Sequence, residues 1–248
     1  MPGVPKVVFI VPYRDRELQK RFYLRNMKYI MEDYSSDSYK FYFAHQCDNR
    51  DFNRGGMKNC GFLAVKNMYP EHYKDITFVF NDIDTMPIDK NMFSFETVHG
   101  KVKHFYGFLF ALGGLLSITG KDFEKIGGFP NFWGWGYEDN VLQQRALEHH
   151  LTIDRSEFLP ILHKNIVHLC DGKNRVIHRT EYSGEYKKDK NNGLSTIYHL
   201  QYDIEDDSMI NVKYFFTGKE ANGKDRRIRD LSVPNPFAKR QPRMYMAM

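Results

Sequence analysis

Short apolar runs alternate with amphipathic segments along the first 80 residues, and this alternation leaves few folds open to the chain. Residues 7–11 and 76–80 are continuous runs of β-branched and aromatic side chains, which is typical of strands buried on both faces. Apolar residues recur at helical spacing over residues 17–31. Strands that alternate with helices predict an α/β fold with a mixed, mostly parallel sheet flanked by helices. The other predicted elements are strands at 40–44 and 115–119 and helices at 56–69 and from 139 to about 150.

The composition is that of a folded globular protein. The chain has 248 residues, of which 42% are hydrophobic and 15% aromatic, enough for one sizeable core. No run of eighteen apolar residues is present, and the N-terminus lacks the pattern of a signal peptide. We therefore expect a cytoplasmic or otherwise soluble protein, or a lumenal protein whose anchor lies outside this chain.

The positive charge is concentrated at the C-terminal end. Residues 219–248 carry eight basic and three acidic side chains, an excess as large as the net charge of +5 of the whole chain. We find no repeat or linker before Thr217, so residues 1–216 are predicted to form one domain and residues 217–248 a basic, partly disordered tail. A solvated tail is the simpler interpretation, and nucleic-acid binding is not expected.

The cysteines exclude two kinds of structural site. Cys47, Cys60 and Cys170 are odd in number and widely spaced, which is a poor disulfide framework and fits a reducing compartment. No Cys-x-x-Cys pair is present, so a structural zinc site is not expected either.

A pair of carboxylates follows a predicted buried strand. Asp82 and Asp84 stand two residues apart at the strand end, where such residues point the same way. Two carboxylates on one side repel each other unless a cation bridges them. A hard divalent ion held by carboxylates and substrate phosphates satisfies this requirement, so the pattern favours metal–nucleotide binding.

Two arginine-containing segments also follow predicted strands. Residues 12–16 contain Arg14 and Arg16, and residues 51–55 contain Phe52 and Arg54. The arginine fork matches phosphate oxygens, and an aromatic ring can stack on a nucleobase. Surface ion pairs with neighbouring aspartates are the alternative for each segment alone. Because ligands bind at the carboxyl ends of such strands, the three segments together predict a nucleotide site.

The segment at residues 127–140 contains both tryptophans among several glycines, followed by two adjacent carboxylates. Glycines let the backbone approach a ligand closely, and aromatic rings stack on sugars. Glu138 or Asp139 can accept a proton beside them. The pattern predicts a sugar-binding loop that ends in a general base.

These pieces resemble the β-1,4-galactosyltransferases in sequence and in order. The similar segments extend from about residue 7 to residue 216, and the Phe-Asn-Arg and Trp-Gly-Trp-Gly-x-Glu-Asp elements are highly specific together. The quoted segments lie at residues 11–16, 52–62, 78–84, 127–139 and 193–196.

The resemblance implies an A-type glycosyltransferase fold and a role for each matching residue. Asp82 would contact the nucleotide-sugar, and Trp135 would lie on a loop that closes over donor and acceptor. Asp139 would be the catalytic base, with Glu138 ordering the acceptor. The residues implied for the uridine-diphosphate cradle are Pro12, Arg14, Arg16, Phe52 and Arg54.

The implied metal site is incomplete. Asp84 and His168 match two family ligands of Mn²⁺, with Mg²⁺ as the alternative ion. The family's methionine position is occupied by Asn165, whose oxygen would suit a hard ion. In the xylose-directed branch of the family the third ligand would fall at Cys170, so the choice stays open.

The family also suggests where donor selectivity arises. A bulky aromatic commonly precedes its Gly-Gly pair, and here that place is taken by Ala111, two residues before Gly113-Gly114. A small residue leaves room for an N-acetyl group, although such contacts shift selectivity by only about 1–3 kcal/mol. UDP-galactose and UDP-N-acetylgalactosamine are both expected donors.

The resulting hypothesis is an inverting, metal-dependent transferase that acts on a carbohydrate or glycoconjugate acceptor. One alternative is a related polysaccharide-building transferase with another donor. A catalytically inactive relative that binds a UDP-sugar or glycan is the other, supported by the incomplete metal site and by Asn140 and Val141 in place of further acidic residues.

Overall fold

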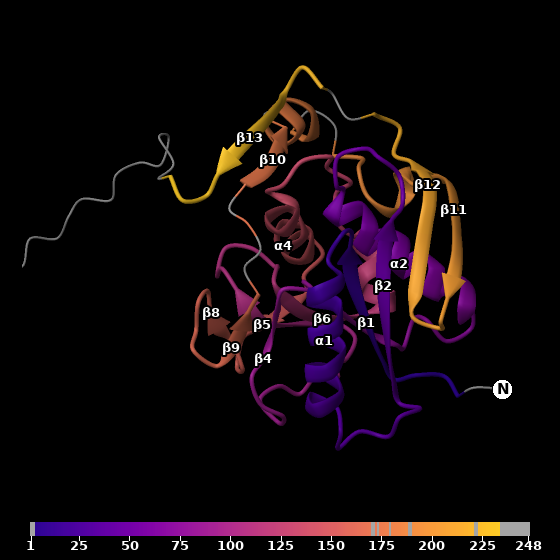
Figure 1. Cartoon of the computed structure of the whole chain (residues 1–248). Helices are drawn as coiled ribbons and strands as arrows, with labels where there is room; N and C mark the ends of the chain where they lie inside the picture. The colour runs from indigo at the N-terminus through magenta and orange to yellow at the C-terminus, as the bar shows by residue number, and fades with distance from the viewer. Residues whose placement is uncertain are drawn as a thin grey trace, which may run out of the picture.

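A single large sheet with helices on both faces forms the body of the protein (Figure 1). The computed structural model describes residues 3–169, 172, 174–178, 180–187, 190–220 and 223–233. Its strands are ordered β11-β12-β2-β1-β3-β6-β5-β7, and β8 pairs with β5. The strands of this sheet are β1 (Val7–Tyr13), β2 (Tyr39–Gln46), β3 (Thr77–Asn81), β5 (Lys101–Gly107), β6 (Leu115–Thr119), β7 (Thr152–Asp154), β8 (Leu159–Pro160), β11 (Tyr198–Glu205) and β12 (Met209–Phe216).

The sheet is mixed but mostly parallel, as predicted. β1 pairs in parallel with both β2 and β3, and β12 pairs in parallel with β2. β6 runs antiparallel between β3 and β5, and β11 closes one edge as an antiparallel partner of β12. The carboxyl ends of β1, β2 and β3 therefore meet at one edge of the sheet.

Side chains of β1 alternate between two separate cores, which explains why its sequence is apolar throughout. Val8 and Ile10 pack in the core under helices α2 (Arg54–Met68), α3 (Gly120–Lys125) and α4 (Glu138–Glu148). Val7 and Phe9 pack on the other face, in the core under α1 (Glu17–Ile30). A strand between two helical layers has no polar face.

The predicted elements of the first 80 residues are confirmed with small shifts at their ends. α2 begins two residues earlier than expected because Asn53 caps it, its side-chain oxygen accepting from the backbone N–H of Gly56 at 2.7 Å. The early glycine of this helix has a packing reason, since a Cβ on Gly55 would lie 2.2 Å from the carbonyl oxygen of Pro130.

Two small strand pairs lie outside the large sheet. β4 (Thr85–Pro87) pairs antiparallel with β9 (Ile166–His168). β10 (Asn174–His178) pairs antiparallel with β13 (Arg226–Asp230), and Figure 1 shows this pair beyond the end of α4. A π-helix (Glu181–Tyr186) and a 3-10 helix (Leu194–Thr196) follow β10 along the chain.

The predicted domain boundary at residue 216 coincides with the end of β12, but the chain beyond it contributes structure. β13 lies inside the region predicted to be a tail, and Arg226 of β13 pairs with Asp51 at 3.1 Å. Lys239, Arg240 and Arg243 of the predicted tail fall outside the described residues. Among the helices that the structure describes, none is long and apolar enough to cross a membrane.

Buried asparagines fix the segment that precedes α4. The Asn59 amide of α2 donates to the carbonyl of Phe129 at 2.7 Å and accepts from the backbone N–H of Phe129 at 3.0 Å. Asn59 also donates to the side-chain oxygen of Asn131 at 2.8 Å, and Asn131 in turn donates to the carbonyl of Gly193. The network ties α2 to the residues that precede Trp133 and, through Asn131, to Gly193.

We expect Asn59→Ala to lower the free energy of unfolding by about 3 kcal/mol, because it leaves several buried polar groups without partners. Urea unfolding followed by circular dichroism measures this change. Asn67→Ala is the matched control, since Asn67 is exposed on the same helix, and it should cost less than about 0.5 kcal/mol. Equal effects of the two substitutions would contradict a role for the buried network.

Candidate active site

Arg54 connects three carboxylates that come from two distant parts of the chain. Its guanidinium binds Asp82 through two bonds, Nε to Oδ1 at 3.0 Å and Nη2 to Oδ2 at 2.6 Å. Its Nη1 donates at 2.9 Å both to Glu138 Oε1 and to Asp139 Oδ1. The start of α2, the end of β3 and the start of α4 therefore converge on one side chain.

The charges of this cluster depend on one another. Burial disfavours ionised Asp82, yet the Arg54 and Lys58 cations outweigh that effect and lower the pKa of Asp82 to about 2. Burial likewise works against the Arg54 cation, but the three carboxylates raise its pKa. The pKa of Glu138 is raised, chiefly by burial. The free protein thus holds a permanently charged arginine between acids with different proton affinities.

Lys58 is a part of this cluster that the sequence analysis missed. Its side chain is fully buried, with Nζ 3.3 Å from Asp82 Oδ1 and 3.9 Å from Asp139 Oδ1. Nζ also lies 4.7 Å from the centre of the Phe129 ring and has no hydrogen-bond partner among the described residues. The spacing from Arg54 could have revealed it, because residues four apart share a helix face.

The carboxylate of Asp139 is fixed in position and partly accessible to solvent. It is the second residue of α4, and its side chain is 24% exposed. The carboxylate packs against the backbone of Gly113, where an added Cβ would lie 2.1 Å from Asp139 Oδ2. The carbonyl of Asp139 accepts from the backbone N–H of Leu112 at 2.9 Å. Gly113 is thus required by the position of the carboxylate.

Both carboxylate oxygens of Glu138 accept hydrogen bonds. Its side chain is only 4% exposed, and Oε2 accepts from the backbone N–H of Gly136 at 2.9 Å while Oε1 binds Arg54. Tyr137, the residue before it, has a left-handed backbone with φ of 69°. This geometry fixes the entry into α4, and the contact of Glu138 with an acceptor stays a prediction.

The predicted nucleotide cradle lies at the ends of β1 and β2. The guanidinium of Arg14 lies 5.2 Å from the centre of the Phe52 ring, and its Nη1 donates to the carbonyl of Arg50 at 2.6 Å. Pro12 is buried in β1 opposite Ala44, and Arg16 is the residue directly before α1. Burial lowers the pKa of Arg14, as expected of a cation recessed in the protein.

The predicted metal ligands Asp84, His168 and Asn165 lie on or next to the paired strands β4 and β9. β4 and β9 pair Thr85 with His168, and the carbonyl of Asp84 accepts from the backbone N–H of Leu169 at 2.8 Å. Asp84 and His168 are therefore at neighbouring positions. The backbone carbonyl of Asn165 accepts from the N–H of Ile88. Ile88 is four residues after Asp84, which corresponds to about 13 Å along a strand. Cys170, the other candidate, lies outside the described residues.

His168 has the properties of a metal ligand. Burial lowers its pKa, which favours the neutral imidazole that binds metals. The Tyr106 hydroxyl lies 3.3 Å from its Nε2. No group of three His, Cys, Asp or Glu side chains is close enough to hold an ion in the described part of the chain. Asp84 and His168 thus suit an ion that takes its remaining ligands from substrate phosphates and water.

The two tryptophans of the glycine-rich segment have different environments. Trp133 is 2% exposed and stacks on Phe215, with ring centres 5.4 Å apart. Trp135 is 45% exposed and is held through its backbone, whose N–H donates to the carbonyl of Val176 in β10 at 2.7 Å. Trp133 anchors the segment in the core, and Trp135 presents its ring to solvent.

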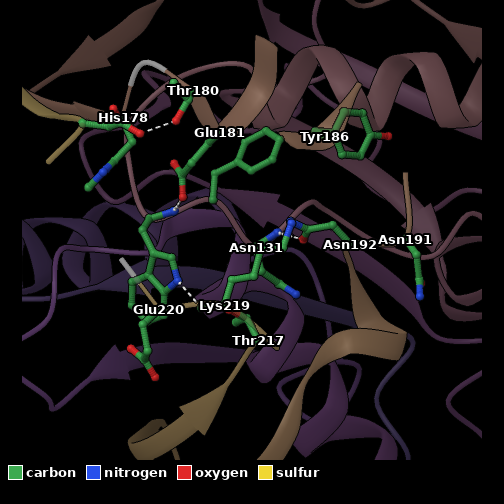
Figure 2. A pocket seen from close by; sticks show the side chains of 13 residues that line it. Asn131, His178, Thr180, Glu181, Tyr186, Asn191, Asn192, Thr217, Lys219 and Glu220 are labelled. Atoms are coloured by element: carbon green, nitrogen blue, oxygen red, sulfur yellow. Dashed lines mark hydrogen bonds between the residues drawn. The ribbon is translucent and has the colours of Figure 1, made fainter. Parts of the chain in front are cut away.

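A small cavity of about 50 Å³ lies behind Trp133, and Figure 2 shows its lining. The Glu181 carboxylate accepts from the backbone N–H groups of Trp133 at 2.6 Å and Gly134 at 3.0 Å. The Trp133 indole donates to the carbonyl of Lys219 at 3.0 Å. These contacts immobilise the first half of the Trp-Gly segment.

Two predicted donor-site residues lie in the turn between β5 and β6. Ala111 is largely buried, with 6% of its surface exposed. The Gly114 carbonyl accepts from the backbone N–H of Asp82 at 3.1 Å. Gly114 thus connects this turn directly to the carboxylate cluster.

Two family models match adjoining parts of the chain. A model of the N-terminal region of glycosyl transferase group 7 matches residues 3–96, and a model of the N-terminal domain of galactosyltransferase matches residues 94–169. The two matches overlap at residues 94–96 and together include Arg54, Asp82, Asp139 and His168.

Relatives are similar over most of this chain. β-1,4-Galactosyltransferase 4 of Cricetulus griseus is 30% identical over 165 residues, 62% of this chain and 46% of the relative. β-1,4-Galactosyltransferase 5 of Mus musculus is 29% identical over 209 residues, 79% of this chain and 51% of the relative. The chain thus spans about half the length of these relatives.

A solved structure shares the fold. It is a mutant of Drosophila β-1,4-galactosyltransferase 7 in complex with manganese, UDP-Gal and xylobiose. The TM-score is 0.62 at 19% identity, with 85% of this chain and 94% of the other covered. The predicted fold class is confirmed by this likeness.

We expect the contribution of Asp82 to stability to depend on pH. Its folded pKa of about 2 lies below the unfolded value of about 3.9, so the stabilisation is complete above about pH 5 and disappears as the pH falls toward 2. Asp82→Asn should lower the free energy of unfolding by about 2 kcal/mol at pH 7, with a smaller difference from wild type at pH 3. Urea unfolding at pH 7, 5, 4 and 3 measures this.

Asp37→Asn serves as the control, because Asp37 is exposed. It should change the free energy of unfolding by less than about 0.5 kcal/mol at every pH. A constant difference between Asp82→Asn and wild type from pH 7 to pH 3 would argue against the ion-pair cluster.

Proposed function

Because the chain belongs to the β-1,4-galactosyltransferase family of glycosyltransferase group 7, we propose that it is an inverting UDP-sugar-dependent hexosyltransferase. It transfers galactose or N-acetylgalactosamine to a hydroxyl of a carbohydrate acceptor. The observation that carries the proposal is the contact of Arg54 with Asp82 on one side and Glu138 and Asp139 on the other. That contact supports a single site that contains the proposed sugar-binding carboxylate Asp82 and the proposed base Asp139.

The donor binds at the edge formed by the ends of β1, β2 and β3. Arg14 supplies a guanidinium for the diphosphate, and Phe52 beneath it supplies a ring for the uracil. Asp82 accepts hydroxyl groups of the sugar, for which its ionised state is suited. Arg54 supplies a second guanidinium near the diphosphate while it stays bound to its carboxylates.

Asp139 acts as the general base. It takes the proton of the acceptor hydroxyl while that oxygen forms a bond to the anomeric carbon and the bond to UDP breaks. Attack from the face opposite UDP inverts the anomeric configuration. Gly113 behind the carboxylate and Arg54 beside it hold Asp139 in place for this step.

Asp84 and His168 hold a divalent cation, Mn²⁺ in preference to Mg²⁺ because of the imidazole ligand. When bound, the ion offsets the charge that builds up on the departing diphosphate. The fold relative with manganese and UDP-Gal supports this assignment. The protein's own contribution is the pairing of β4 with β9, which keeps the two ligands at neighbouring positions.

Trp135 covers the donor and excludes water, which limits hydrolysis of the UDP-sugar. Only its backbone is bound to β10, so the exposed ring is available to a ligand. Donor choice depends on the turn at Ala111, where a small side chain accommodates an N-acetyl group. A panel of UDP-sugars separates galactose from N-acetylgalactosamine and from the donors of polysaccharide-building relatives.

We expect Asp139→Asn to lower kcat by about 10²- to 10⁴-fold, the usual contribution of a positioned general base. Release of UDP from UDP-galactose and UDP-N-acetylgalactosamine, with a panel of acceptor sugars, measures turnover. UDP affinity by calorimetry should stay within about threefold of wild type, because the amide keeps the size of the carboxylate.

Asp154→Asn is the control for this experiment, because Asp154 lies on β7 and pairs with Lys101 away from the cluster. Its turnover should equal that of wild type. Near-normal turnover of Asp139→Asn would show that another group is the base. Absence of turnover in the wild-type protein with every donor, together with normal UDP binding, would favour an inactive UDP-sugar-binding relative.

His168→Ala should weaken Mn²⁺-dependent binding of UDP by at least about tenfold, since even outer-shell changes cost about 10- to 100-fold in metal affinity. Calorimetric titration with UDP in the presence and absence of Mn²⁺ gives the comparison. His163→Ala and Asn165→Ala are matched controls at the turn before β9, and both should retain the Mn²⁺ effect. A loss in Asn165→Ala equal to that in His168→Ala would place Asn165 in the site.

A further inference from the structure

Five apolar side chains form an exposed patch beside the proposed base. Leu109 and Phe110 are each 64% exposed and Leu162 is 75% exposed, whereas most large apolar residues of the chain are buried. We define the apolar patch as Phe108, Leu109, Phe110, Ile161 and Leu162. Contiguous exposed apolar side chains of this kind usually mark a binding surface.

The topology of the sheet brings the two halves of the patch together. β5 and β8 run in parallel, with Tyr106 opposite Leu159 and Gly107 opposite Pro160. The chain leaves both strands at the same end, so residues 108–110 and 161–162 emerge side by side. The backbone N–H of Leu162 also donates to the Tyr106 hydroxyl at 3.3 Å.

Hydrogen bonds fix the backbone of the segment that carries Leu109 and Phe110. Arg155 donates to the carbonyl of Leu109 at 2.9 Å, and Asn140 donates to the carbonyl of Phe110 at 3.1 Å. The rings of Phe108 and Phe110 stack with centres 5.1 Å apart and planes at 17°. Hydrogen bonds from Arg155 and Asn140 thus fix the backbone of this segment, while its apolar side chains remain exposed.

The same segment borders Asp139. Asn140, which binds the Phe110 carbonyl, follows the proposed base directly, and the Leu112 N–H donates to the carbonyl of Asp139 at 2.9 Å. The patch therefore lies within a few residues of the place that an acceptor hydroxyl must reach. A group attached to the acceptor sugar on this side would contact apolar side chains.

We propose that the acceptor is an amphipathic glycoside, in which the accepting sugar carries an alkyl, aryl or lipid aglycone that lies on the apolar patch. The inference rests on the proposed transferase function and names its acceptor class. Burial of methylene groups against Leu109, Phe110 and Leu162 strengthens acceptor binding without altering the chemistry at Asp139.

Matched acceptors that differ only in the aglycone test this proposal. Methyl and octyl β-glycosides of N-acetylglucosamine, xylose and glucose are compared below the critical micelle concentration, with UDP release as the readout. For the accepted sugar, kcat/KM for the octyl glycoside should exceed that for the methyl glycoside by about tenfold or more, through a lower KM. Leu162→Ser and Leu109→Ser should reduce this ratio toward one.

Val98→Ser is the control variant, because Val98 is 65% exposed but precedes the opposite end of β5. It should keep the wild-type ratio. Turnover of methyl and octyl glycosides with equal kcat/KM would overturn the inference and leave the transferase function intact, as would a ratio that both patch variants preserve. Vesicle flotation or dimerisation that depends on Leu162, without an aglycone preference, would assign the patch to a membrane or a second copy. Absence of turnover with all of the methyl and octyl glycosides would instead count against the transferase function itself.

Discussion

The sharing of one guanidinium by three carboxylates is the constraint on which the site depends. Arg54 is the first residue of α2, where the partial positive charge of the helix terminus disfavours a cation. Asp82, Glu138 and Asp139 offset this cost, and the Arg54 cation in turn reduces the repulsion among them. Ion pairs therefore hold together the start of α2, the end of β3 and the start of α4. The two apolar cores fix the sheet on which these elements lie.

Much of the framework could be predicted because it depends on local sequence. A strand between two helical layers must be apolar throughout, and a helix that packs on it must repeat every three to four residues. The parallel order of such strands then requires their carboxyl ends to share an edge. For this reason the proximity of Arg54 to Asp82 could be expected before any coordinates, and so could the neighbouring positions of Asp84 and His168, through the family resemblance.

Contacts set by long-range packing could not be predicted. The place of Asn165 depends on the register of β9 on β4, which puts its backbone opposite Ile88. Trp133 and Trp135 look equivalent in sequence, and only the positions of Phe215 and β10 make one an anchor and the other a free ring. Lys58 was overlooked because a lysine on a helix is usually solvated, and its burial depends on Phe129, more than 70 residues away.

The pairing of β10 with β13 has a consequence for how the protein is made. Trp135 hydrogen-bonds to β10, and β10 is held in place by a strand that follows it by almost 50 residues. Arg226 of that strand also reaches back 175 positions to Asp51, at the end of β2. During translation the sheet and the Arg54 cluster can assemble while the C-terminal residues are still inside the ribosome. The support of Trp135 by β10 and β13 cannot, so a nascent chain has the Arg54 cluster before the backbone of Trp135 is held in place.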